Sequence, residues 1–123
     1  MKKKIVISIN PEHVKNILSG NKKFEYRKLA AKHDVSSIII YETAPTKRIV
    51  AEAEILEVIM LPPEQLWQET KEAAGISKPF FDAYFQGKKN AYAYKLGRIT
   101  EYQEPKSLID FGIKAPPQSF VYV

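Results

Sequence analysis

The sequence predicts an α+β fold, and three observations support that class. Two runs rich in β-branched residues, 5–9 and 38–40, have the composition of strands. Two longer segments, which begin at Arg48 and Ala91, alternate their side chains between two faces as half-buried strands do. Between those segments the apolar residues instead recur at helical spacing. Such a mixture of separate strands and helices is typical of the α+β class.

Length and composition describe one folded domain over residues 1–123. A chain of 123 residues with 45% hydrophobic side chains can enclose one modest core. It has no run of 18 apolar residues, so no membrane span is expected. The basic start is followed by too few apolar residues for a signal peptide, and Asn10-Pro11-Glu12 interrupts them. We therefore expect a first strand in a cytoplasmic protein.

The chain contains no cysteine. Disulfides, thiolate nucleophiles and cysteine-ligated zinc are therefore excluded. The histidines at 13 and 33 are too few for a multi-histidine metal centre, although carboxylates alone can bind magnesium. We expect no cofactor and no metal, and the lack of cysteine fits a reducing compartment.

The formal charge is +5, from 19 Lys and Arg against 14 Asp and Glu, with a pI near 9.3. Such an excess favours polyanionic partners, of which nucleic acid is the commonest. Many small proteins are mildly basic without binding nucleic acid, so charge alone leaves both possibilities open.

The first predicted helix follows the opening strand at residues 4–9. Asn10 can serve as N-cap, and Pro11 occupies the first helical position, where its missing N–H is harmless. The apolar residues then follow at helical spacing: Val14, Ile17 and Leu18. Gly20 suits the left-handed position after a helix, so a helix about ten residues long is expected.

Two central strands are predicted after a polar, basic loop at 28–36. The continuous apolar run within 37–42 is typical of a strand buried on both faces, and a break is expected at 43–46. From Arg48 the alternation predicts a strand with one polar face. Beyond Ile55 the alternation becomes irregular, which predicts a bulge or strong bend of the kind barrels need.

A helical insertion opens at Pro62-Pro63. Its first helix is predicted to end at Gly75, with these residues on one face: Leu66, Trp67, Thr70, Ala73 and Ala74. Ser77 can cap a second helix that ends at Gly87. The aromatic residues of that helix repeat at three-to-four spacing: Phe80, Phe81, Tyr84 and Phe85. This stripe predicts a core face, because a base-stacking platform would need exposed rings.

The last part of the chain supplies two further strands. One is predicted from Ala91 to Thr100, and residues 102–106 after it are polar. The other, from Phe120 to Val123, is expected to close the sheet.

The residues best suited to binding or catalysis lie in one short stretch: Gly20-Asn21-Lys22-Lys23-Phe24-Glu25-Tyr26-Arg27. It lies between the first helix and the next strand. If its second half is extended, Glu25 and Arg27 share one face, and Phe24 and Tyr26 share the other. One face can then pack on a core while the other faces a site.

The spacing Gly20-x-Lys22-x-x-Glu25-x-Arg27 resembles the G-x-K-x-x-E-x-R signature of the ASCH family, which belongs to the PUA-like superfamily. The order of strands and helices is similar along most of the chain, and the Pro-Gln-Ser-aromatic tail at 117–120 resembles that of some small members. The resemblance implies a PUA-like open β-barrel of about five to six strands with surrounding helices, in which the motif lines a cleft. Relatives with this fold bind RNA or modified nucleotides, and some act as small hydrolases.

The resemblance thus implies a domain that binds RNA, or a modified nucleotide or nucleoside, in a basic cleft around the motif, with no membrane partner. Lys22 and Arg27 would contact phosphate or a carbonyl oxygen, and Glu25 would accept from a base amino group. Further basic residues extend the predicted contact: Lys23, Arg48 and Lys95.

The alternative is a small metal-independent hydrolase with Lys22 and Glu25 as its catalytic groups. A partly desolvated lysine loses its proton more easily and can act as base or nucleophile. Some ASCH relatives are amidohydrolases that deacylate N-acylated cytidine with this lysine, a threonine three residues later and a glutamate from the insertion. Here Glu25 stands at the threonine position and Glu72 is the nearest carboxylate, so that activity does not carry over unchanged.

Two other functions remain open. A ribonuclease needs an acid and a base on either side of a phosphate, for which this chain offers candidates without a defined pair. A protein-interaction module is the third class.

Each candidate residue also has a purely structural interpretation. Lys22 can be one more exposed lysine, and Glu25 with Arg27 can simply satisfy two charges on a sheet face. His13 is expected at the surface or in packing.

Other polar and aromatic residues are secondary candidates. Glu52 and Glu54 fit the solvated side of a sheet, unless that side is the cleft. Gln118 and Ser119 are possible donors from a cleft wall. Three tyrosines suit base stacking and core packing equally: Tyr41, Tyr92 and Tyr94.

Overall fold

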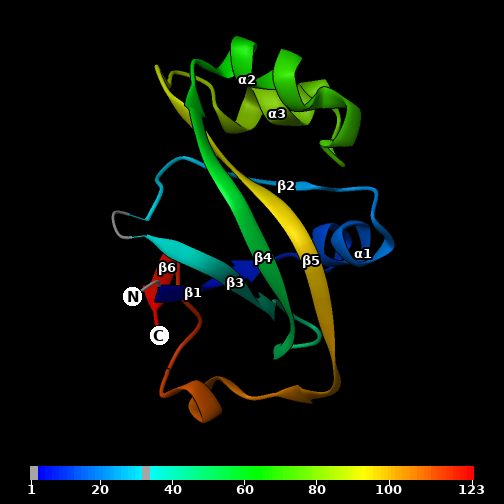
Figure 1. Ribbon diagram of the computed structural model, residues 1–123, viewed down its shortest axis with the longest axis vertical. Coiled ribbons are helices and arrows are strands. Elements are labelled where there is room, and N and C mark those ends of the chain that lie inside the picture. The colour runs from blue at the N-terminus through cyan, green and yellow to red at the C-terminus, as the bar shows by residue number, and fades with distance from the viewer. Residues whose placement is uncertain (1–2, 32–33) are drawn as a thin grey trace.

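The computed structural model describes residues 3–31 and 34–123 and confirms the α+β class (Figure 1). Six strands form one curled sheet in the order β2-β5-β4-β3-β1-β6. Strands β1 (Lys3–Ile9) and β3 (Val35–Glu42) run parallel, and the other neighbouring pairs are antiparallel. Because β2 and β6 are edges, the barrel is open, as predicted. Part of the expected 28–36 loop, with His33, lies outside the described residues.

A long antiparallel ribbon runs through the height of the molecule (Figure 1). It consists of β4 (Arg48–Leu61) and β5 (Ala91–Lys106). Their register shifts on both sides of Ile55, which confirms that the strand is irregular where a bulge or bend was predicted. Strand β5 is longer than predicted, because its polar end beyond Thr100 still pairs with the start of β4. Backbone pairing needs no apolar side chain, so alternation alone missed this extension.

Helix α1 (Pro11–Ser19) starts and stops as its sequence predicts. Asn10 is extended, Pro11 follows it, and Gly20 is left-handed with φ 87°. Val14 and Ile17 are buried against the largest core cluster, which lies between the helix and the sheet. The other main members of that cluster come from four strands: Ile5, Ile7, Ile38, Ile40, Ala51, Ala53, Tyr94 and Leu96.

The helical insertion lies beyond one end of the ribbon, next to β2 (Phe24–Arg27), as Figure 1 shows. It contains α2 (Pro63–Thr70), the 3₁₀ turn η1 (Lys71–Ala73) and α3 (Lys78–Tyr84). The insertion, β2 and the start of β5 enclose a second core cluster: Tyr26, Leu66, Trp67, Ala74, Phe81, Phe85, Ala91 and Ala93.

Three predictions for the insertion were wrong in detail. Its first helix ends at Thr70 and not at Gly75. The carbonyl oxygens of Ala73 and Ala74 accept hydrogen bonds from the motif segment, so they do not continue a helical ladder. The second helix ends at Tyr84 and not at Gly87. Phe81 and Phe85 are buried as expected, but Phe80 is 49% exposed and is not part of the core.

The chain ends with the 3₁₀ turn η2 (Leu108–Phe111) and β6 (Phe120–Tyr122), which pairs with β1 at the sheet edge. A third cluster lies under this segment and includes Val6, Tyr41 and Ile113. Within the described ranges, no helix is both long and apolar enough to cross a membrane.

Candidate functional site

The motif segment is held by backbone hydrogen bonds on both sides. The N–H of Lys22 donates to the carbonyl oxygen of Asn16 in α1 at 3.0 Å, and the N–H of Lys23 donates to that of Ala73 at 2.8 Å. After this turn β2 pairs with β5, with Glu25 opposite Tyr94. The segment is therefore fixed between the first helix, the insertion and the sheet.

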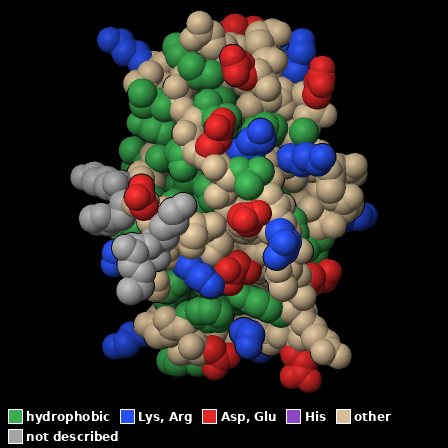
Figure 2. Space-filling model, in the orientation of Figure 1, with side chains coloured by type: hydrophobic (Ala, Val, Ile, Leu, Met, Phe, Trp, Pro, Cys, Tyr) green, Lys and Arg blue, Asp and Glu red, His purple; other side chains and the backbone are tan. Residues whose placement is uncertain are grey.

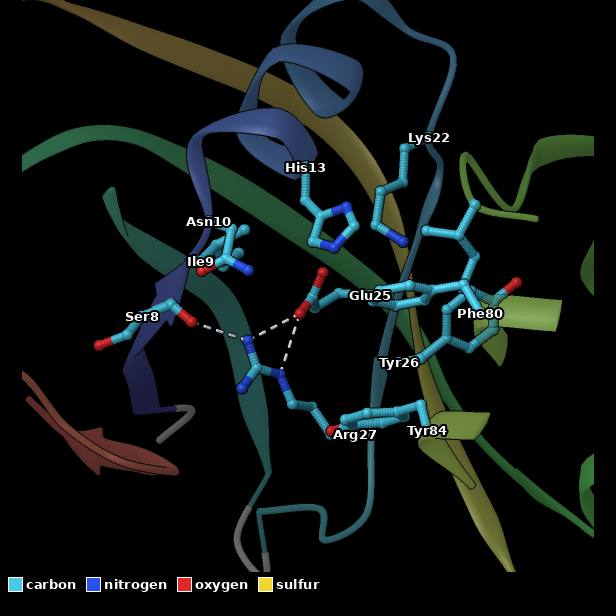
Figure 3. Close-up of a pocket in the computed structure, with 11 residues that line it drawn as sticks. Ser8, Ile9, Asn10, His13, Lys22, Glu25, Tyr26, Arg27, Phe80 and Tyr84 are labelled. Carbon is cyan, nitrogen blue, oxygen red and sulfur yellow. Dashed lines mark hydrogen bonds and ion pairs between the residues drawn. The ribbon is translucent and has the colours of Figure 1, made fainter. Parts of the chain in front are cut away.

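A pocket of about 190 Å³ opens beside this segment (Figure 3). Its walls come from the end of β1, from α1, from β2 and its preceding turn, and from the insertion. The lining residues are Ser8, Ile9, Asn10, His13, Lys22, Glu25, Tyr26, Arg27, Ile76, Phe80 and Tyr84. The three charged motif side chains thus line one hollow. Its volume is below the roughly 300–1,000 Å³ of drug-sized ligand sites.

Lys22 is the most deeply placed charged group of the pocket, with only 3% of its surface exposed. Its Nζ donates to the carbonyl oxygen of Ala74 at 3.0 Å and lies 4.7 Å from the centre of the Tyr26 ring. Burial lowers the pKa of the Lys22 amine, and Glu25 opposes part of that shift. An ammonium has three protons to donate, so this amine retains capacity toward the pocket.

Glu25 and Arg27 form an ion pair on one face of β2, as alternation predicted. One carboxylate oxygen accepts from Arg27 Nη2 at 2.8 Å and from Nε at 2.9 Å. The same Nη2 donates to the carbonyl oxygen of Ser8 at 2.9 Å, which anchors the guanidinium to the end of β1. In Figure 3 the carboxylate points into the pocket, toward the His13 ring. Glu25 is 5% exposed, so this ion pair is largely shielded from solvent.

His13 lies between Lys22 and Glu25 in Figure 3. Its ring meets Phe80 edge-on, with 5.5 Å between centroids and 71° between planes. Burial and the Lys22 charge lower the pKa of His13, against smaller raising effects of Glu25 and Glu12. Its Nδ1 is buried and has no hydrogen-bond partner among the described residues. A neutral ring can leave this nitrogen as a bare acceptor, whereas an imidazolium would bury an unpaired donor.

Two tyrosines complete the wall. The hydroxyl of Tyr26 lies 2.6 Å from the Thr70 hydroxyl, which itself donates to the carbonyl oxygen of Leu66 at 2.7 Å. Tyr26 is therefore the donor of this pair, since Thr70 has a single proton. Burial raises the pKa of Tyr26 to about 12. Burial also raises the pKa of Tyr84, whose ring lies 4.8 Å from Lys28 Nζ.

The other predicted basic contacts do not line this pocket. Lys23 and Lys95 are exposed along the β2–β5 pair, and Arg48 is exposed at the start of β4. Figure 2 shows acidic and basic side chains interspersed over the face in view, without a continuous basic patch.

The two central glutamates line a different hollow. Glu52 accepts from Lys4 Nζ at 2.9 Å and from Ser37 Oγ at 2.9 Å, and Glu54 accepts from the N–H of Arg98 at 3.1 Å. Despite the cost of burial, the hydrogen bonds from Lys4 and Ser37 lower the pKa of Glu52. Both glutamates are thus paired away from Lys22.

The remaining candidates also lie outside the pocket lining. Tyr41 and Tyr94 are buried in core clusters, and the Tyr94 hydroxyl accepts from the N–H of Ala31 at 2.9 Å. Tyr92 is half-buried on β5, and Gln118, Ser119 and Glu72 are exposed. The carboxylate of an amidohydrolase-like triad is therefore not supplied by Glu72. No group of three or more His, Asp or Glu side chains within 3–31 and 34–123 is placed to hold a metal.

Sequence reasoning missed the apolar and histidine part of the wall. His13 precedes Ile17 by one helical turn, so its position on the inner face of α1 was available from spacing. Ile76 and Phe80 gave no comparable signal, because they face the site only through the folding of the insertion.

The curled, open sheet with its motif-bearing edge strand and helical insertion defines a PUA-like domain. The chain belongs to the ASCH domain family, whose profile matches residues 7–109. ASCH from Zymomonas mobilis has a similar structure, with a TM-score of 0.88 and 30% identity over 98% of this chain and 87% of that one. A serine-to-alanine variant of that protein has a TM-score of 0.89 and 28% identity, and the match covers 99% of this chain and 89% of the variant.

Curated relatives carry different names. An ASCH domain-containing ribonuclease of Zymomonas mobilis is 32% identical over 96 residues, which are 77% of this chain and 65% of that protein. A Ureaplasma parvum protein named large ribosomal subunit protein uL22 is 28% identical over 97% of this chain. The chain spans only 39% of the length of that relative.

Proposed function

We propose that this chain binds single-stranded RNA at the pocket around Lys22 and cleaves the RNA backbone there. The observation that carries the proposal is the convergence of a buried lysine amine, a paired carboxylate and a histidine on one hollow. Similarity to a protein named a ribonuclease supports it. A cysteine-free chain fits a reducing compartment, so the substrate would be cytoplasmic RNA.

The size of the pocket favours single-stranded over double-stranded RNA. A hollow of about 190 Å³ has room for one unstacked base or one phosphate, not for a duplex. Single-stranded RNA offers such unstacked bases, which proteins bind by ring contacts and hydrogen bonds to their edges. Lys22 and Arg27 supply positive charge for the phosphate, and Glu25 can accept from a base amino group or from a hydroxyl.

The acid and base needed for cleavage are both among the pocket groups. The ribose 2′-hydroxyl loses its proton as its oxygen attacks phosphorus, and the bond from phosphorus to the 5′ oxygen breaks as that oxygen gains a proton. In this proposal the Glu25 carboxylate or the neutral His13 ring would accept the first proton, and the Lys22 ammonium would supply the second. The products would be a 2′,3′-cyclic phosphate and a 5′-hydroxyl.

The test uses a single-stranded RNA of mixed sequence, with products identified by mass spectrometry. Lys22→Met keeps most of the side-chain volume and removes the amine, and Lys114→Met removes one exposed charge elsewhere. We expect cyclic-phosphate ends from wild type and Lys114→Met, and a rate reduced by roughly 100-fold or more for Lys22→Met. N-acylated cytidine in a parallel reaction tests the deacylase alternative.

Three results would contradict the proposal. Equal cleavage by Lys22→Met would place the reaction elsewhere. Salt-sensitive RNA binding that needs Lys22 but gives no product would reject cleavage and leave an RNA-binding domain. Turnover of the acylated nucleoside alone would assign the pocket to deacylation.

A further inference from the structure

A second hollow adjoins the pocket, with a volume of about 450 Å³. Its lining residues are Glu12, His13, Gly75, Ile76, Ser77 and Phe80. Three of them, His13, Ile76 and Phe80, also line the pocket at Lys22. The two hollows are therefore neighbouring compartments of one cleft, with the edge-on contact of His13 and Phe80 on their common wall.

Phe80 gives the second compartment an aromatic wall. Its side chain is 49% exposed, whereas Phe81 and Phe85 of the same segment are almost fully buried. The core of the insertion thus does not need the Phe80 ring. An exposed aromatic ring beside a nucleotide site is what stacking of an unpaired base requires.

The charges of the two compartments differ. Lys22 and Arg27 line the first, whereas no lysine or arginine is among the described residues that line the second. The second compartment instead has the carboxylate of Glu12. It therefore suits a neutral ring better than a phosphate, and Glu12 can accept a hydrogen bond from an exocyclic amino group. Cytosine and adenine carry such a group on the edge where uracil has an acceptor.

We propose that the second compartment is a subsite for the nucleobase next to the one at Lys22, with the base stacked on Phe80 and its amino group bound by Glu12. This inference rests on the proposed RNA function and deepens it, because it makes the ligand at least two nucleotides long. It also assigns a preference for an amino-bearing base at one position of the RNA.

The experiment compares cytidine 5′-monophosphate with 2′-O-methylated CpC and UpU, in which the attacking hydroxyl is blocked. Calorimetry would measure binding to wild type, Glu12→Ala and Phe80→Ala. Ile109→Ala is the control, since Ile109 is exposed but lines neither compartment. We expect CpC to bind wild type and the control more tightly than the mononucleotide and UpU.

The two variants separate stacking from base recognition. Phe80→Ala should weaken CpC roughly tenfold or more, and more than it weakens the mononucleotide. Glu12→Ala should reduce the preference for CpC over UpU and leave mononucleotide binding intact. Two results would overturn the subsite alone. One is that CpC binds wild type no more tightly than the mononucleotide. The other is that Phe80→Ala weakens the binding of CpC and of the mononucleotide equally. No binding of any probe would overturn the RNA function together with the subsite.

Discussion

Gly75 lies directly against Lys22, so no residue larger than glycine fits at position 75 without a clash. A Cβ atom built on Gly75 would come within 2.9 Å of Lys22 Cα and closer still to its Cβ and Cγ. Gly75 also has a φ of 69°, in the region that favours glycine. The residue therefore permits the close approach of the insertion that buries the Lys22 amine.

Gly75→Ala should displace Lys22 and abolish the RNA binding and cleavage that we propose for this residue. The expected cost has two parts, a left-handed backbone that alanine tolerates poorly and a clash with the lysine side chain. Gly87→Ala is the matched control, since Gly87 has a φ of 79° and open space at the same position. Both variants should lose about 1 kcal/mol of stability from the backbone, measured by urea denaturation, but only Gly75→Ala should lose the proposed cleavage of RNA. Similar activity in both would show that Lys22 does not depend on the contact.

Arg27→Gln should destabilise the fold because it leaves the Glu25 carboxylate buried without its cation. Both side chains are largely shielded from solvent, and removal of one partner from such a pair costs roughly 3 kcal/mol. The double variant Arg27→Gln, Glu25→Gln removes both charges and should recover most of the loss. Urea denaturation of wild type, of both single variants, Arg27→Gln and Glu25→Gln, and of the double variant gives the coupling energy. A double variant no more stable than Arg27→Gln would refute the unpaired charge as the cause.

His13 should make the fold less stable as the pH falls below its ordinary pKa. Burial and the charge of Lys22 lower the pKa of the folded state below 6.5, so the unfolded chain binds this proton first. The unfolding free energy therefore decreases as the pH is lowered from about 7 to the folded-state pKa of His13, and it stays constant at lower pH. His13→Gln removes this contribution, so the difference between variant and wild type isolates it. Parallel pH profiles of the two proteins would contradict the expected sign and origin.

The sequence was most informative where local chemistry decides the backbone. Asn10, Pro11 and Gly20 mark both ends of α1, and the alternation along β2 is enough to place Glu25 and Arg27 on a common face. The open barrel followed from the family resemblance. Periodicity alone reports which residues share a face, and gives no order of strands in a sheet.

What sequence reasoning missed depends on contacts between distant segments. The carbonyl oxygens of Ala73 and Ala74 are acceptors that every residue possesses, so no pattern marks them as partners of the motif. Phe80 differs from Phe81 only by its direction around α3, and helical spacing could not show that this side of the helix faces an open cleft. The pocket therefore combines a recognisable motif with a wall that only the fold supplies.

The Lys22 amine and the Lys23 N–H both donate to main-chain carbonyls of the insertion, which means that the signature is not transplantable by itself. Residues 20–27 grafted onto another sheet would keep their sequence but lose the carbonyl oxygen that accepts from the lysine amine. Their lysine would then be an ordinary solvated cation with an ordinary pKa. A chain that carries the eight-residue signature without a segment like 73–75 should therefore be regarded as having the motif but not the pocket.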